Sequence, residues 1–159
     1  MKLSLIAAIG KNNELGKNND LIWHLPGDLK FFKETTMNKT VIMGYNTYLS
    51  LPRKLPNRKY IVLSLEDKNL GEDIEVYNDI NILKEALQQK EEEMFIIGGA
   101  SMYKQFLDDC ENLYLTEIDA ESEADVYFPI FDKTKYTREI IGENEDNNIK
   151  YKHIIYRRK

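Results

Sequence analysis

Short apolar runs that alternate with helix-like segments constrain this chain of 159 residues more than any other feature of its sequence. Four runs contain few polar side chains or none, as is typical of strands buried on both faces of a sheet. They cover residues 3–9, 41–43, 61–63 and 94–97. Apolar residues at helical spacing lie between and after these runs. Those segments cover residues 26–36, 46–51, 82–90 and 100–107. Strands that alternate with helices pair in parallel, because each helix forms the crossover between two strands.

The last third of the chain has a different pattern. Residues 113–118, 136–141 and 149–157 are strand-like with little helix between them, and the acidic, Asn-rich link 143–148 predicts an antiparallel hairpin. We therefore expect a single α/β domain over residues 1–159. Its central sheet is mixed and mostly parallel, with about eight strands and a C-terminal antiparallel hairpin, and four helices flank it.

Composition excludes several classes of protein. A net charge of −5 argues against broad nucleic-acid binding. The apolar runs are shorter than the roughly 20 residues that span a bilayer, and the N-terminus lacks a secretory pattern, so we expect a cytoplasmic protein without membrane contact. Cys110 is the only cysteine, and His24 and His153 have no ligand-like spacing, so we expect neither a disulfide nor a bound metal. Nothing in the sequence requires an oligomer, and we expect a monomer.

Asp28 is the first candidate for chemistry. Pro26 favours the start of a helix, and helical spacing places Leu25, Asp28, Leu29 and Phe32 on one stripe. A carboxylate on an apolar stripe is costly unless it is paired, although the first helical turn favours negative charge. The alternative is an ordinary acidic residue near a helix start.

Two glycine turns follow predicted strands. Gly98 and Gly99 come directly after residues 94–97 and before a helix, and Gly44 follows residues 41–43 in the same way. Backbone amides at such turns bind phosphate, and parallel strands bring their carboxyl ends to one edge. Plain tight turns are the alternative, and neither copy is the usual six-residue dinucleotide fingerprint.

Residues 10–20 form a polar segment with two glycines and one apolar residue, Leu15. Such a segment can act as a lid that excludes water from a hydride-transfer site. A flexible surface loop is the alternative, and the neighbouring Trp23 is more often a core residue.

Six segments in order resemble the dihydrofolate reductase family over most of the chain. They cover residues 5–8, 16–29, 41–44, 55–58, 97–103 and 115–120. The resemblance implies that 7,8-dihydrofolate is reduced to tetrahydrofolate, with hydride passing from NADPH to C6 and a proton arriving at N5. It also implies that antifolates inhibit the protein.

The same resemblance implies roles for individual residues. It assigns catalysis to Asp28, Leu21, Trp23 and Thr116, with Thr116 bonded to the Asp28 carboxylate and water delivering the proton. It assigns the substrate site to Ile6, Ala7, Asp28, Leu29, Phe32, Leu51, Arg53, Leu55, Arg58 and Thr116, with Arg58 binding the substrate's α-carboxylate. It assigns the cofactor site to Ala8, Leu15, Gly16, Asn19, Leu21, Gly44, Tyr45, Asn46, Thr47, Leu63, Ser64, Leu65, Ile97, Gly98, Gly99, Ala100, Ser101, Met102, Tyr103 and Gln105. The family joins the two glycines at 98 and 99 by a cis peptide.

The chain departs from the family pattern where the 2′-phosphate of NADPH is bound. Tyr45 and Ser101 replace the usual arginines, and Leu65 replaces a serine or threonine. We therefore expect NADPH with weaker discrimination against NADH than the family shows. Candidate basic residues are Lys59, Lys68 and Lys104, whereas Glu66 opposes phosphate binding.

A second departure is Ile22, where the family has proline, and it predicts altered lid dynamics.

Two other functions fit parts of the pattern. One is a reductase of the same architecture that acts on a pyrimidine intermediate of riboflavin synthesis, which needs neither Asp28 nor Arg58. The other is an inactive dinucleotide- or folate-binding regulator.

Overall fold

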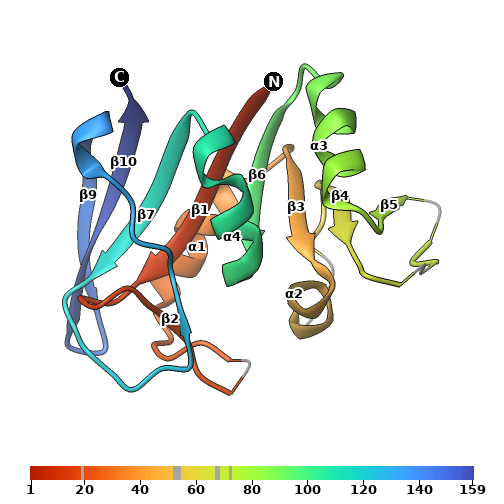
Figure 1. Cartoon of the computed structure of the whole chain (residues 1–159). Coiled ribbons are helices and arrows are strands. Elements are labelled where there is room, and N and C mark those ends of the chain that lie inside the picture. The colour runs from red at the N-terminus through yellow and green to blue at the C-terminus, as the bar shows by residue number, and fades with distance from the viewer. Residues whose placement is uncertain (19, 52–54, 67–68, 72) are drawn as a thin grey trace.

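An eight-stranded sheet forms the centre of the computed structural model, which describes residues 1–18, 20–51, 55–66, 69–71 and 73–159. The strands are β1 (Lys2–Ile9), β3 (Thr40–Gly44), β4 (Lys59–Leu63), β5 (Ile74–Tyr77), β6 (Glu93–Gly98), β7 (Asn112–Ile118), β9 (Tyr136–Asp146) and β10 (Ile149–Arg158). Their order is β5-β4-β3-β6-β1-β7-β10-β9 (Figure 1). The first six strands in that order pair in parallel, and β10 pairs antiparallel with both β7 and β9. The predicted mostly parallel sheet with a C-terminal antiparallel hairpin is confirmed.

Helices cover both faces of this sheet (Figure 1). Among the described residues, the α-helices are α1 (Pro26–Thr35), α2 (Tyr45–Ser50), α3 (Ile80–Gln88) and α4 (Ala100–Phe106). Leu87 of α3 and Phe106 of α4 pack with Leu5 in one core cluster, whereas Tyr48 of α2 packs with Met43 in another. Burial on both faces explains why the central strands are almost continuously apolar.

The C-terminal hairpin is longer than its sequence suggested. The predicted link 143–148 is wrong, because β9 continues to Asp146 and only Asn147 and Asn148 form the turn. Both asparagines have positive φ, 53° and 64°, as a two-residue type I′ turn requires. Asparagine tolerates this conformation better than most residues. Because the two asparagines alone form the turn, residues 143–146 extend β9.

A second, two-stranded sheet joins β2 (Glu14–Gly16) to β8 (Val126–Tyr127). The strand β2 lies inside the segment predicted as a lid. Short 3₁₀-helices follow α4 and precede β9, at Leu107–Asp109 and Lys133–Lys135.

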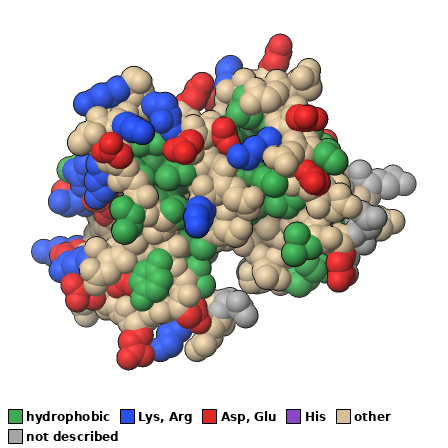
Figure 2. All heavy atoms as spheres, in the orientation of Figure 1, with side chains coloured by type: hydrophobic (Ala, Val, Ile, Leu, Met, Phe, Trp, Pro, Cys, Tyr) green, Lys and Arg blue, Asp and Glu red, His purple; other side chains and the backbone are tan. Residues whose placement is uncertain are grey.

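The surface carries charges of both signs. Figure 2 shows basic side chains chiefly on the side of β9 and β10, with acidic side chains among them. In the same view the molecule is hollowed between the segment around β2 and helix α2. Among the described residues, no helix has the length and hydrophobicity needed to cross a membrane.

Candidate active site

Asp28 lies in the first turn of α1 and is held by two side chains from the sheet. The Thr116 hydroxyl donates to Asp28 Oδ1 at 2.5 Å, and His153 Nε2 lies 3.0 Å from the same oxygen. Thr116 and His153 are register partners on β7 and β10, so both side chains leave the sheet on the same face. The predicted contact between Thr116 and Asp28 is present, and the histidine is an addition that the sequence did not indicate.

The start of α1 is fixed by the distant hairpin. Leu25 occupies the N-cap position without a capping side chain, and Asp146 of β9 takes that role by accepting a 2.8 Å bond from the Gly27 N–H. The Tyr151 hydroxyl donates to the same Asp146 oxygen at 2.6 Å. Burial, together with this bond to Asp146, raises the pKa of Tyr151, which keeps the hydroxyl protonated as a donor. A Cβ on Gly27 would lie 2.9 Å from Asp146 Oδ2, so glycine permits the close approach.

The stripe that carries Asp28 is more open than its apolar residues suggested. Leu25 is buried, but Leu29 is 51% exposed and α1 contains no fully buried residue. The expected apolar stripe is therefore only partly buried, because the helix contacts the sheet through Phe31, stacked on His153, and leaves Leu29 at the surface. The Asp28 side chain is 21% exposed, so its carboxylate lies at the edge of the protein interior and is accessible to a ligand.

Several predicted wall residues lie on the same side of the sheet. Ile6 is buried in β1, and its carbonyl accepts a 2.7 Å bond from the Tyr103 hydroxyl. Leu51 and Leu55 pack against the cluster beneath α2. Ala7 packs instead into the cluster under α3 and α4, so only its backbone faces the candidate site. Arg53 lies outside the described residues.

Arg58 is fixed beside the C-terminal end of α1. Its guanidinium donates to Thr36 Oγ1 at 3.2 Å, to the Pro56 carbonyl at 2.6 Å and to the Lys33 carbonyl. Burial lowers its pKa from the usual value of 12.5. No described carboxylate pairs with this guanidinium, so its charge is available to an anionic ligand.

The two glycine turns lie side by side, because β6 is inserted next to β3. A Cβ on Gly98 would lie 3.3 Å from Thr47 Oγ1, and one on Gly99 would lie 3.4 Å from it. Gly98 also has a φ of 136°, which side-chain-bearing residues rarely adopt, and its peptide bond to Gly99 is cis. The turn after β6 therefore approaches the start of α2 closely, as expected if the two glycine turns bind one dinucleotide.

The remaining cofactor candidates are spread over several elements. Ala8 pairs with Thr116, and the Gln105 amide donates to the Ser101 hydroxyl at 3.0 Å. Tyr45 stacks on Tyr48. The other described members lie in or after β2, β4 and β6, and in α2 and α4. They are Leu15, Gly16, Leu21, Asn46, Leu63, Ser64, Leu65, Ile97, Ala100 and Met102, whereas Asn19 lies outside the described residues.

The three candidate lysines differ in position. Lys59 starts β4, at the opposite end of the strand from Leu63, and its ammonium lies 3.7 Å from Glu92. The suggestion that it binds the 2′-phosphate is therefore wrong. Lys68 lies outside the described residues. Lys104 is exposed on α4, one turn after Ser101.

The predicted lid is connected to the loop around β8. Gly16 O accepts a 3.1 Å bond from the Asp125 N–H, and the Asp125 carboxylate accepts one of 3.0 Å from the Asn18 N–H. Trp23 packs over the start of the segment, because a Cβ on Gly10 would lie only 2.5 Å from its Cη2. The segment has defined contacts, and its movement stays a prediction.

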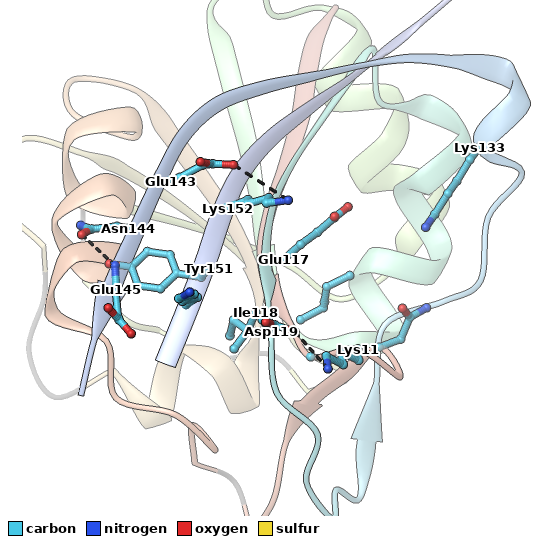
Figure 3. A pocket seen from close by; sticks show the side chains of 14 residues that line it. Lys11, Glu117, Ile118, Asp119, Lys133, Glu143, Asn144, Glu145, Tyr151 and Lys152 are labelled. Atoms are coloured by element: carbon cyan, nitrogen blue, oxygen red, sulfur yellow. Dashed lines mark hydrogen bonds and ion pairs between the residues drawn. The ribbon is translucent and has the colours of Figure 1, made fainter. Parts of the chain in front are cut away.

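A surface groove of about 790 Å³ lies elsewhere, between β7, β10 and residues 9–13. Figure 3 shows its charged lining, which includes ion pairs of Lys11 with Asp119 and of Lys152 with Glu143. Glu117 and Lys152 alternate along their strands with Thr116 and His153, so they point to the opposite face. None of the predicted site residues lines this groove.

The comparisons with known proteins agree with this arrangement. The family model described as dihydrofolate reductase matches residues 2–158. A relative named dihydrofolate reductase type 3, from Salmonella typhimurium, is 43% identical over 129 residues, which is 81% of this chain and 79% of the relative. The dihydrofolate reductase of Bacillus subtilis (strain 168) is 37% identical over 99% of this chain and 95% of its own length.

A solved structure shows the same fold. The dihydrofolate reductase from Enterococcus faecalis, complexed with NADP(H) and RAB-propyl, superposes with a TM-score of 0.89 at 30% identity, covering 99% of this chain and 96% of that one. The fold and site define an α/β protein with a partly exposed acid and two adjacent glycine turns. The chain belongs to the dihydrofolate reductase family.

Proposed function

We propose that this chain reduces 7,8-dihydrofolate to tetrahydrofolate with NADPH as the hydride donor. The observation that carries the proposal is the Asp28 carboxylate, whose Oδ1 is held by Thr116 and His153 at a partly exposed position. Among the described residues, no hydrogen bond reaches Oδ2. That oxygen is therefore available to accept hydrogen bonds from a substrate.

Asp28 acts as an anchor for the pterin ring. An ionised carboxylate accepts hydrogen bonds from an amino group and an adjacent ring N–H, which matches the 2-amino and N3 positions of the pterin. This contact orients the ring and favours protonation at N5, while water supplies the proton. Leu29 and Phe32 on α1 and Ile6 on β1 form apolar walls that restrict the access of other water.

The cofactor site is supported by the paired glycine turns. Gly98 and Gly99 leave room beside Thr47 that a Cβ would fill, and both turns end parallel strands that precede helices. Such ends suit a dinucleotide phosphate. NADPH supplies the hydride when it is bound. The chain's own residues hold the phosphates at these turns, and Tyr103, fixed by its bond to Ile6, lines the nicotinamide side.

Arg58 binds the anionic tail of the substrate. Its bonds to carbonyl groups and to Thr36 orient the guanidinium without neutralising it. A substrate carboxylate then forms the charge-assisted contact. Antifolates that carry a pterin-like ring compete at Asp28.

We also propose that NADPH is preferred only weakly over NADH. Tyr45 and Ser101 stand where the family has arginine, and among the described candidate lysines only Lys104 lies near these turns. The ratio of kcat/KM for NADPH to that for NADH should stay below about a thousand, because a larger ratio needs about 4 kcal/mol of phosphate-specific binding. Steady-state kinetics with both cofactors measure it, and a ratio above that value contradicts the assignment.

The same proposal describes a single-domain monomer that acts in the cytoplasm and has no nucleic-acid partner. The net charge of −5 supports the last point. Analytical ultracentrifugation at micromolar concentration tests the monomer, and a sedimenting dimer would contradict it.

Loss of absorbance at 340 nm tests the function. The purified chain, NADPH and dihydrofolate are mixed, and we expect a decline that an antifolate stops. A decline with the riboflavin-pathway pyrimidine instead of dihydrofolate favours the related reductase. Binding of NADPH without a decline in either mixture favours an inactive binding protein.

A further inference from the structure

We propose that His153 is a positioning residue for the catalytic acid, holding the Asp28 carboxylate in the orientation that presents Oδ2 to the pterin. The proposal rests on the reductase function proposed above. It concerns a side chain that the sequence analysis considered only as a metal ligand and set aside.

The geometry points to a direct contact with the acid. His153 Nε2 lies 3.0 Å from Asp28 Oδ1, and the Thr116 hydroxyl donates to the same atom at 2.5 Å. Two contacts on one carboxylate oxygen fix the rotation of the carboxylate about its Cβ–Cγ bond. The other oxygen is then directed away from the sheet, toward the candidate substrate site.

A bulge in β9 lies opposite this ring. The register of β10 against β9 shifts between His153 and Ile154, so that Ile141 of β9 is an extra residue opposite them. Such a bulge interrupts the ladder locally and increases its twist, and bulges are common beside active sites. Gly142, the register partner of His153, would bring a Cβ within 3.7 Å of His153 Nδ1. A side chain at residue 142 would therefore contact this edge of the ring.

The ring is also fixed on its face. Phe31, which follows Asp28 by almost one helical turn on α1, stacks on His153 with ring centroids 3.9 Å apart and an interplanar angle of 10°. The side chain of His153 is only 10% exposed. Helix α1 therefore supplies both the Asp28 carboxylate and the Phe31 ring that orients the histidine.

The charged and titratable neighbours of the ring come from three elements. Asp28 on α1 faces Nε2, and Tyr151 on β10 lies edge-on with its centroid 5.4 Å away. Asp146 on β9 binds the Tyr151 hydroxyl. Thr116 on β7 contributes an uncharged hydroxyl. Asp28 is thus the one of these groups within hydrogen-bonding distance of the ring.

Each protonation state of the histidine supports an ionised Asp28. The neutral ring with hydrogen on Nε2 donates a hydrogen bond to Oδ1, and the protonated ring adds an ion pair to it.

The first experiment measures the contact without turnover. The imidazole nitrogen signals of His153 are recorded by NMR at neutral pH, in a His24→Gln background that leaves one histidine. We expect the Nε2 signal to shift when Asp28→Asn is added, because its hydrogen-bonding partner changes from a carboxylate to an amide. An Nε2 signal that does not move overturns the proposal.

The second experiment measures the positioning. His153→Phe keeps an aromatic ring against Phe31 but removes the donor, and His153→Gln keeps an uncharged donor at a similar reach. With saturating NADPH, we expect kcat/KM for dihydrofolate to fall about tenfold in His153→Phe and to recover most of this loss in His153→Gln. KM for NADPH should stay within twofold of the wild-type value in both variants.

A control variant and the NMR measurement keep the outcomes distinct. His24→Gln changes the other, exposed histidine and should match wild-type kinetics. Equal losses in His153→Phe and His153→Gln, or a loss that falls on KM for NADPH, indicate a structural role and overturn the proposal. If the wild-type chain does not oxidise NADPH with dihydrofolate, the proposed function fails, while the NMR measurement still decides whether His153 and Asp28 interact.

Discussion

Removal of the Thr116 hydroxyl is the most specific test of the candidate site. Thr116→Val removes the 2.5 Å bond to Asp28 Oδ1 and keeps the branched shape of a side chain that is 3% exposed. A hydrogen bond to a charged group contributes about 1.5–3 kcal/mol. His153 still contacts the same oxygen, so the lower half of that range applies. The lower half is about 1.5–2.25 kcal/mol, and each 1.36 kcal/mol is a factor of ten, which predicts a loss of about 13- to 45-fold.

The assay is kcat/KM for dihydrofolate at saturating NADPH, with NADPH affinity measured separately by fluorescence. Thr40→Val is a matched control, because Thr40 is equally buried in β3 and donates a 2.9 Å bond to Glu92, away from the site. We expect this control to keep wild-type kinetics and the NADPH affinity of Thr116→Val to be unchanged. If Thr116→Val stays within twofold of the wild-type kcat/KM, the bond does not position the acid and the reasoning is refuted.

Two further predictions concern the segment that precedes α1. Burial opposes ionisation of Glu14, but backbone N–H groups of Asn12 and Ser122 donate to its carboxylate at 2.7 and 2.9 Å and hold its pKa below the usual 4.5. A group whose pKa is lower in the folded state stabilises the fold at pH values above its unfolded-state pKa. This stability is lost as the pH falls through its folded-state pKa. Glu14→Gln should therefore lower the urea midpoint at pH 7 and do so less at pH 4, unlike the exposed control Glu85→Gln; an equal effect at both pH values refutes this. Ile22→Pro should speed hydride transfer or slow product release in stopped-flow kinetics by restricting the end of the lid, and identical rates in every step refute a role of Ile22 in lid motion.

The sheet was largely predictable, and its exceptions have local causes. Residues 3–9 and 94–97 were recognised because burial on both faces leaves few polar positions. The strand β5, Ile74–Tyr77, was missed because it is a short edge strand that contains Glu75. The strands β2 and β8 are shorter still, with two or three residues each, and carry no alternating pattern long enough to detect.

The site was predictable only where a local motif carried it. Asp28 was recognised from the helical spacing after Pro26, and the two glycine turns from their positions directly after apolar strands. Thr116 was assigned by resemblance. Asp146, Tyr151 and His153 were missed because their contacts depend on the register of the hairpin and on its bulge, which no local pattern encodes. The spacing of Tyr151 and His153 places both on one face of a strand, but that signal alone names no partner.

The central claim is that Asp28 anchors the pterin so that hydride reaches C6. The most direct measurement uses NADPH with deuterium at both C4 positions of the nicotinamide and locates the label in the product by NMR and mass spectrometry. We predict one deuterium at C6 of tetrahydrofolate with the wild-type chain. Asp28→Asn should lose most of this labelled product at neutral pH, with NADPH affinity nearly unchanged. Product without deuterium at C6, or a near-normal rate of labelled product from Asp28→Asn, would contradict the account.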